Sequence, residues 1–157
     1  MSAVLTGCST APGAGDLIKE DPGEGCFPQT AGKPVQINMT VIRNTHDVAA
    51  NIESVRLEDS QGIRLEDALL LPLEQWSEVV VGDVFDADDP AWVGAERAEG
   101  ASVGAGQNLG LVLVVSADAT GGTSKPVEVE YTLDGRRYEA RSSNDLKIVP
   151  VGSVCGG

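Results

Sequence analysis

The sequence predicts an all-β protein, folded as a single antiparallel β-sandwich of about seven strands. Short runs of alternating apolar and polar residues recur along the chain, which is the pattern of strands with one buried face. Helix signals are few, and 19 Gly and 8 Pro interrupt the runs. Short strands joined by such connections are typical of two-layer β folds. A chain of 157 residues is long enough for one domain with a sustaining apolar core.

The first half of the predicted domain contains three or four strands. Residues 35–41 alternate with the period of a strand, and a turn at residues 44–47 separates them from an extended run at 52–57. Residues 63–71 also suit one face of a helix, but the run is short for a helix and we expect a strand. The β-branched run 79–81 predicts a further short strand, and residues 83–108 predict a long loop with several glycines.

The second half begins with a strand that we expect to be buried on both sides. Residues 109–115 are almost wholly apolar, as in central strands that are covered on both faces. Residues 127–133 then alternate, and Asp134-Gly135 indicates a type I′ hairpin with a two-residue loop. That loop sets the register, pairing Leu133 with Arg136, Thr132 with Arg137, Tyr131 with Tyr138, Glu130 with Glu139, Val129 with Ala140 and Glu128 with Arg141. A last short strand at 146–149 ends at Pro150.

The amino-terminal stretch Leu5-Thr6-Gly7-Cys8 is typical of a bacterial lipoprotein cleavage site. The small Gly7 admits the signal peptidase, and the Cys8 thiol would carry a diacylglycerol. Residues 9–32 are rich in Gly, Pro, Ser, Thr and acidic residues, so we expect residues 1–32 to be a truncated lipobox followed by a flexible tether. Only a short run precedes Thr6, which is less apolar sequence than an export signal needs. Either the start is trimmed or assigned too far downstream, or the match is accidental and the protein stays inside.

The cysteine count is consistent with export. The chain has 3 Cys, so lipidation of Cys8 would leave Cys26 and Cys155 as a pair. A disulfide between them would bracket nearly the whole predicted domain and would stabilise it by about 5 kcal/mol in the chain-entropy model. The alternative is that both are free, small buried side chains of a cytosolic protein. We expect the disulfide if the compartment is oxidising.

Several segments of the predicted domain carry a resemblance. They are Val41-Ile42-Arg43-Asn44 before a turn, Ile52-Glu53-Ser54-Val55, the Gly-rich loop that enters residues 109–115, and Val129-Glu130-Tyr131 with Asp134-Gly135-Arg136-Arg137-Tyr138. This succession resembles small immunoglobulin-like lipoproteins of Gram-positive, high-GC bacteria over residues 33–150. The resemblance implies an immunoglobulin-like domain over residues 33–155 and a place in the cell envelope. It implies no shared catalytic residues.

The charge of the chain limits its partners. With 11 Lys and Arg against 24 Asp and Glu, the formal net charge is −13, which repels nucleic acids and anionic lipid headgroups. No run approaches the roughly 20 apolar residues of a membrane-spanning helix. We therefore expect no nucleic-acid partner, and we expect contact with the membrane only through a lipid on Cys8.

Candidate chemistry is sparse. His46, the one histidine, stands beside Asp47 in a predicted turn, and we interpret it as an exposed turn residue rather than a catalytic base. The loop carries a run of carboxylates that offers oxygen ligands for Ca²⁺, although a solvated acidic loop is the plainer interpretation: Asp83, Asp86, Asp88 and Asp89. Three aromatic residues flank this run and would either grip a partner protein or glycan, or cover the ends of the core: Trp76, Phe85 and Trp92.

Together these features predict a non-catalytic, envelope-anchored module that binds or scaffolds another envelope component, without a cofactor. The main alternative is an unlipidated structural or assembly accessory protein. A hydrolase or metal-dependent enzyme ranks last, because the chain lacks a Gly-x-Ser-x-Gly elbow and the usual His and Cys ligand sets for soft metals. The sequence does not predict the partner's identity or the oligomeric state.

Overall fold

A computed structural model describes residues 11–156 and confirms the all-β prediction. Its strands and helices, in chain order, are β1 (Gly13–Ala14), β2 (Gly23–Phe27), β3 (Val35–Arg43), β4 (Ala50–Leu57), β5 (Ile63–Pro72), α1 (Leu73–Glu78), the 3-10 helix η1 (Pro90–Trp92), β6 (Glu96–Arg97), β7 (Ser102–Val103), β8 (Asn108–Ala117), β9 (Gly122–Ser124), β10 (Val127–Leu133), β11 (Arg136–Arg141) and β12 (Asn144–Ile148). No helix in this part of the chain has the length and apolar character needed to cross a membrane.

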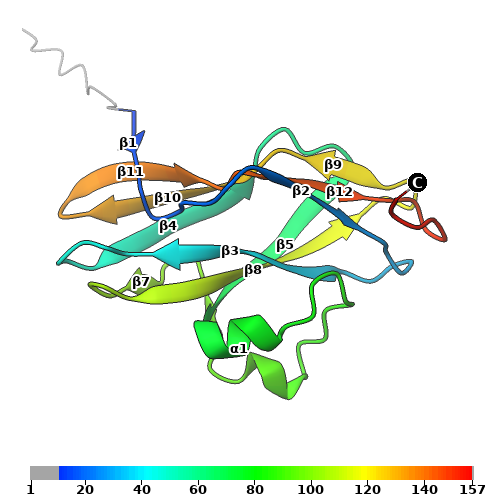
Figure 1. The fold of residues 1–157 in the computed structure, drawn as a ribbon, viewed down its shortest axis with the longest axis horizontal. Coiled ribbons are helices and arrows are strands. Elements are labelled where there is room, and N and C mark those ends of the chain that lie inside the picture. Colours follow the sequence, from blue (N-terminus) through cyan, green and yellow to red (C-terminus); the bar gives the residue numbers. More distant parts are fainter. Residues whose placement is uncertain (1–10, 157) are drawn as a thin grey trace, which may run out of the picture.

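The strands form two layers that face each other (Figure 1). One layer contains a five-stranded sheet in the order β1-β11-β10-β4-β7, and a three-stranded sheet, β2-β12-β9, which lies beyond its right-hand end in Figure 1. The other layer is a four-stranded sheet in the order β3-β8-β5-β6. The main core lies between the layers and draws side chains from all three sheets, including Ile52, Val115, Val129 and Ile148.

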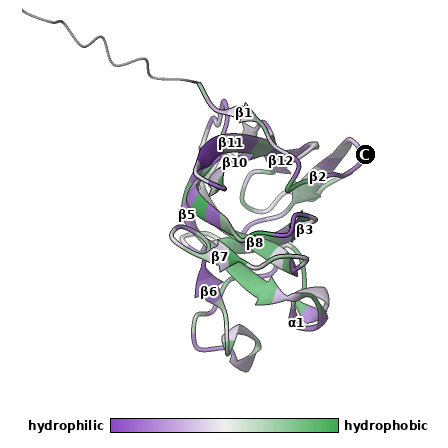
Figure 2. Cartoon of the chain, turned by 90° about the vertical axis from the view of Figure 1, so that its left-hand side faces the viewer, coloured by the Kyte–Doolittle hydropathy of each residue, from purple (hydrophilic) through white to green (hydrophobic). Residues whose placement is uncertain are grey.

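Strand β8 is buried on both faces, as its sequence predicts. Leu111, Leu113 and Val115 point into the main core, whereas Val112 and Val114 belong to a second cluster on the outer side of the same sheet. Figure 2 shows this apolar strand with α1 close beside it. The outer face of the four-stranded sheet therefore needs a cover of its own.

The predicted hairpin is confirmed residue for residue. Strands β10 and β11 pair in antiparallel fashion, with Tyr131 opposite Tyr138 and Glu128 opposite Arg141. Asp134 and Gly135 both have positive φ, at 51° and 76°, as a type I′ turn requires. The two tyrosine rings stack with their centroids 5.7 Å apart. Turn chemistry and cross-strand pairing thus specify one register.

The prediction of a tether reaching residue 32 was wrong for residues 13–27. Strand β1 pairs with β11 and β2 pairs with β12, both in parallel orientation, so the sandwich is not wholly antiparallel. Between these strands Leu17 is completely buried and Ile18 is 7% exposed. A segment rich in Gly is held because its backbone pairs with the edge of the sheet while two apolar side chains enter the core.

Two further expectations changed. Residues 79–81 form no strand; Val79 is buried, but Val80 and Val81 lie in a turn with their side chains largely exposed. The strand count exceeds seven because the amino-terminal strands and several very short ones, such as β6 and β7, carry no alternation that a sequence pattern can detect. Residues 63–71 are extended, as expected.

The disulfide between Cys26 and Cys155 is present, with Cα atoms 5.9 Å apart. It ties β2 to the segment that follows β12 and closes a loop of 129 residues. Because β2 also pairs with β12, the bond reinforces the same junction between the two ends of the domain.

Replacing Leu17 with Ala tests whether the amino-terminal segment belongs to the folded domain. We expect the free energy of unfolding to fall by about 2 to 5 kcal/mol, because the change removes a fully buried side chain and leaves a cavity. Denaturant unfolding of the oxidised protein measures this. Val154→Ala, at a side chain that is 81% exposed, is the control and should change stability by less than about 0.5 kcal/mol. Equal stability of the two variants would contradict the docking of residues 13–27.

Candidate functional site

Residues 73–95 form a cap over the outer face of the four-stranded sheet, and this cap contains all the predicted aromatic and calcium-site residues. It comprises α1, the loop that follows, and η1. Trp76, Phe85 and Trp92 are partly buried and pack against Val112 and Val114 of β8. The aromatic residues therefore cover the outer face of this sheet and complete a second apolar cluster, rather than covering the ends of the main core.

Trp76 fixes α1 directly on β8. Its Nε1–H donates a hydrogen bond to the Leu111 carbonyl oxygen at 3.2 Å. A Cβ on Gly110 would lie 1.9 Å from Trp76 Cγ, so only glycine allows the indole to approach the strand this closely. Phe85 and Trp92 contact each other farther along the cap, with ring centroids 5.1 Å apart. The apolar side of the cap is thus closely packed.

The cap is also bonded to strand β3. Asn38 Nδ2 donates to the carbonyl oxygens of Trp76 and Val79, at 3.0 and 2.9 Å. Gln36 Nε2 donates to the Val80 carbonyl oxygen at 2.9 Å. Backbone hydrogen bonds continue the attachment, from Gly82 N–H to the Gln36 oxygen and from Phe85 N–H to the Pro34 oxygen. Residues 79–85 therefore have a defined backbone conformation.

The four loop aspartates are not gathered into a calcium site. Asp86 Oδ1 accepts the Asp88 N–H at 3.0 Å, and Asp89 Oδ1 accepts the Ala91 N–H at 2.9 Å at the start of η1. These carboxylates shape turns, as Asp side chains commonly do. Among residues 11–156, the acidic group that is compact enough to hold an ion lies elsewhere in the molecule.

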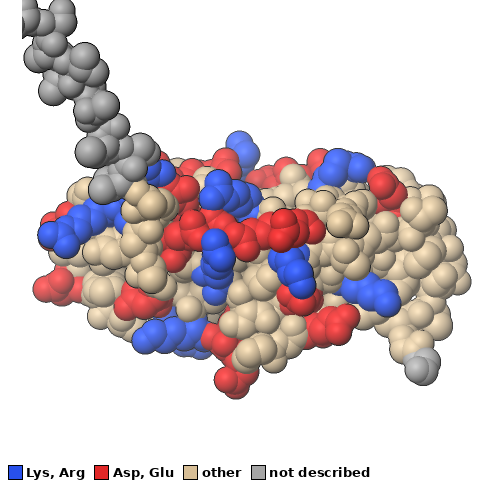
Figure 3. Space-filling model, turned by 90° about the horizontal axis from the view of Figure 1, so that it is seen from above, with Lys and Arg blue, Asp and Glu red and all other residues tan. Residues whose placement is uncertain are grey.

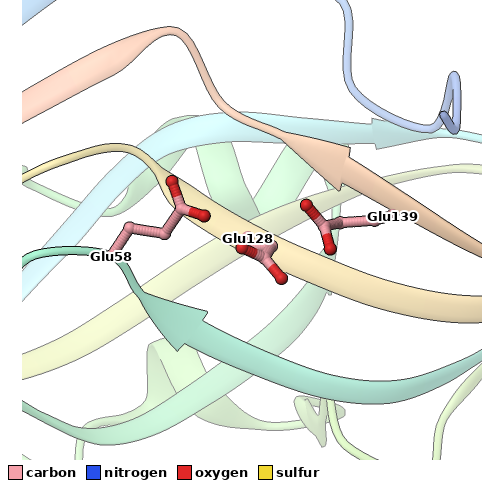
Figure 4. A group of neighbouring side chains, drawn as sticks. All are labelled: Glu58, Glu128 and Glu139. Carbon is pink, nitrogen blue, oxygen red and sulfur yellow. The ribbon is translucent and has the colours of Figure 1, made fainter. Parts of the chain in front are cut away.

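That compact group is Glu58, Glu128 and Glu139, which lie on neighbouring strands or at their ends (Figure 4). One carboxylate oxygen from each residue lies within 4.8 Å of the others. The sequence did not reveal this group, because Glu58 meets Glu128 only through the pairing of β4 with β10. Long-range strand pairing of this kind leaves no local pattern.

Arginine side chains already neutralise these carboxylates. Glu128, whose side chain is 3% exposed, bonds to Arg56 on one side, and Arg141 lies 3.6 Å away on the other. Arg141 also contacts Glu139 at 2.7 Å and Glu58 at 3.0 Å. The bond to Glu128 raises the pKa of Arg56, and the bond to Glu139 raises the pKa of Arg141. Figure 3 shows this face with acidic and basic side chains interspersed. The group is an ion-pair network across the sheet.

His46 lies at the surface and pairs with Asp16. Its Nε2 is 2.9 Å from Asp16 Oδ1, and this hydrogen bond is the main cause that lowers the pKa of the Asp16 carboxyl. The Asp16 N–H in turn donates to the Tyr131 hydroxyl at 3.1 Å, while burial raises the pKa of Tyr131. Rather than facing a substrate cavity, His46 helps to hold the amino-terminal segment against the domain.

A groove of about 590 Å³ runs between β4 and β5, along the residues that the short strands β7 and β6 leave unpaired. Its apolar floor belongs to the core, and its charged rim is largely paired: Arg97 lies 3.4 Å from Asp67, and Arg64 lies 3.2 Å from Asp118. The groove therefore presents no group that is poised for chemistry.

The lipidation candidate Cys8 lies outside the described residues. The sequence also missed the feature that most distinguishes the cap, which is a set of exposed valines at positions 80, 81, 84 and 93. The β-branched run at residues 79–81 predicted a short strand there instead. The signal against a strand was the short length of that run, which Gly82 and Asp83 end after three residues.

Replacing Trp76 with Ala distinguishes a structural from a partner-binding role for the aromatic residues. We expect a loss of about 3 kcal/mol in the free energy of unfolding, because the indole packs on β8 and bonds to Leu111. Val93→Ala on the same cap removes a side chain that is 71% exposed and should be nearly neutral. If both variants were as stable as the parent in denaturant unfolding, the packing role of Trp76 would be refuted.

Calcium should not change the melting temperature of the protein. The loop aspartates do not converge, and the compact carboxylates are held by arginines, so an ion would have to displace existing pairs. Thermal melts in calcium and in EDTA should therefore coincide. A higher melting temperature in calcium that is lost in Asp86→Asn would support a calcium site in the loop. A higher melting temperature that is lost in Glu139→Gln would indicate a site in the ion-pair network instead.

Comparison of the chain with protein-family profiles, with curated proteins and with solved structures finds no match. Evidence on function therefore comes from the contacts, the charges and the sequence features of the chain. Two of these features bear most directly on function, namely the cysteines and the outward side of the cap.

Proposed function

We propose that the protein is a non-catalytic binding or scaffolding module of the bacterial cell envelope, held at the outer side of the membrane by a lipid on Cys8. The observation that carries the proposal is the pairing of Cys26 with Cys155, which leaves Cys8 as the one cysteine of the chain outside this disulfide. Disulfides persist in oxidising, extracytoplasmic compartments. Cys8, the third cysteine, is also the one preceded by Leu5-Thr6-Gly7.

A lipid on Cys8 would place the domain close to the membrane. Strand β1 begins at Gly13, five residues after Cys8, and a fully extended chain of that length spans at most about 17 Å. The spacer is therefore short, since residues 13–27 belong to the fold. A short spacer suits a module that acts on components at or near the membrane surface.

The strand order supports an immunoglobulin-like topology for this module. With β2, β3, β4, β5, β8, β10 and β11 counted as the seven main strands, the order β3-β8-β5 places the second beside the fifth and the fifth beside the fourth. In the other layer the order β4-β10-β11 places the third beside the sixth and the sixth beside the seventh. Immunoglobulin constant-type domains share these neighbours, although their first strand lies beside the second, whereas here β2 pairs with β12. Domains of this topology commonly serve recognition at cell surfaces.

The state of the polar groups favours binding over catalysis. His46 is engaged with Asp16, and the buried Glu128 is engaged with Arg56 and Arg141. A general base or nucleophile needs an accessible position beside a substrate cavity. In the described part of the chain these groups instead hold strands and segments together.

The proposal is tested on the protein expressed from its own gene, with its natural upstream sequence, in its native bacterium. We expect the protein to enter the detergent phase and to yield an amino-terminal peptide that starts at Cys8 and carries a diacylglycerol. Cys8→Ala should shift it to the aqueous phase. The double variant Cys26→Ala and Cys155→Ala is the matched control and should keep the lipid.

Mass spectrometry under non-reducing conditions completes the test. Isolation of a cytosolic protein with an unmodified Cys8 and free thiols at Cys26 and Cys155 would overturn the proposal. An oxidised but unlipidated protein outside the cytosol would favour the accessory-protein alternative.

A further inference from the structure

We propose that the outward side of the cap, residues 73–95, is the surface that binds the partner, and that the partner is a protein whose contact surface combines apolar side chains with Lys and Arg. The inference rests on the proposed function, because it names the surface and the partner chemistry of the same binding module. Three observations carry it: exposed apolar side chains, a firmly held backbone and unpaired negative charge.

Exposed apolar side chains are concentrated on the cap. Within residues 11–156, seven large apolar residues are exposed, and four of them lie in this segment: Val80 at 58%, Val81 at 44%, Val84 at 37% and Val93 at 71%. Exposed apolar side chains that are grouped and rimmed by polar residues are a property of protein contact sites. Their position beside a completed core means that they are not needed for folding of that core.

The backbone that carries Val80, Val81 and Val84 is held before any partner binds. Val84 forms an antiparallel bridge with Val35 at the edge of β3. The Gly82 N–H bonds to the Gln36 oxygen at 2.7 Å, and the Gln36 N–H bonds to the Asp83 oxygen at 2.9 Å. A contact surface with a fixed backbone loses little conformational entropy on binding. The three valines are therefore presented as a preformed surface.

The charge of the cap specifies the partner's chemistry. Residues 73–95 contain no Lys or Arg and six carboxylates: Glu74, Glu78, Asp83, Asp86, Asp88 and Asp89. The ion pairs seen in the described chain include none of these six. By contrast, Arg56, Arg137 and Arg141 neutralise the acidic residues of the β10 face. Unpaired carboxylates around exposed valines complement a basic rim around an apolar patch.

The orientation of the cap suits this role. Strand β1, the first strand after Cys8 in the sequence, is on the opposite side of the molecule from α1 in both Figure 1 and Figure 2. With the lipid attached at the β1 side, the cap points away from the membrane. It is then accessible to a second envelope protein, while the anionic membrane surface does not face the acidic cap.

The first test uses the oxidised full chain labelled with ¹⁵N and a short peptide of alternating Leu and Lys as a defined probe. We expect the amide signals of residues 79–95 to shift on titration, and we expect binding to weaken at high salt. A peptide of Ser and Lys with equal length and charge should bind about tenfold more weakly, because the apolar contacts are missing. Shifts that map to the β10 face, or equal binding of the two peptides, would overturn the inference.

Matched variants separate the two parts of the surface. The pair Val80→Ser and Val81→Ser, and separately the pair Glu78→Gln and Asp83→Asn, should each weaken binding of the Leu–Lys peptide about tenfold. These side chains are exposed, so both variants should melt like the parent. The control pair is Glu53→Gln and Val154→Ser, an exposed acid and an exposed valine outside the cap, and should leave binding unchanged. Equal losses in control and cap variants would contradict the assignment.

A photo-crosslinking residue placed at Val80 in the native bacterium distinguishes this inference from the proposed function. We expect crosslinks at Val80 but not at Val154, to a protein peptide that contains apolar residues with Lys or Arg. Crosslinks confined to other faces, or to an acidic peptide or a glycan, would overturn the cap assignment and leave the module's binding role standing. Absence of a crosslink from every tested face of the membrane-bound protein would count against both.

Discussion

The burial of strand β8 on both faces is the constraint on which the rest of the structure depends. The apolar side chains on one face of β8 pack in the core between the sheets, and those on the other face, Val112 and Val114, pack in a second cluster. A sandwich of two sheets covers only the first side. The cap therefore exists because the second side must also leave water, and Trp76 on Gly110 is the contact that fixes it there. Because its apolar side is committed to β8, the cap's outward side is free to carry other residues.

The two outer faces of the molecule differ in how their charges are arranged. Across β4, β10 and β11, carboxylates and guanidinium groups alternate and satisfy one another, so a buried residue such as Glu128 is stable. On the cap, the six carboxylates form no ion pair in the described chain, and exposed valines lie in the same segment. A net charge of −13 thus includes a locally neutralised face and a strongly acidic one. The acidic face is better suited to binding a partner, because unpaired charge adds long-range attraction for a basic partner.

The structural features that could be predicted from the sequence are those that depend on residues adjacent in the chain. Asp134-Gly135 determines its turn locally, and the register of β10 and β11 followed from it. The burial of β8 on both faces followed from its apolar run, and the disulfide followed from the cysteine count. The amino-terminal strands were missed because Gly13–Ala14 and Gly23–Phe27 have little alternation, and their order comes from pairing with strands more than a hundred residues away. The valine surface and the Glu58–Glu128–Glu139 group were missed for the same reason, since tertiary contacts decide which side chains are covered or brought together.

The cap is a fixed part of the fold and presents its outward residues on a rigid backbone. Native-state amide hydrogen exchange, measured by NMR on the oxidised protein, tests this most directly. We expect the amides of Gly82 and Phe85, which bond to the oxygens of Gln36 in β3 and of Pro34 just before it at 2.7 and 2.9 Å, to be protected to a degree comparable with the amides of β8. Exchange of both amides at the rate of an unstructured peptide, while β8 stays protected, would contradict it.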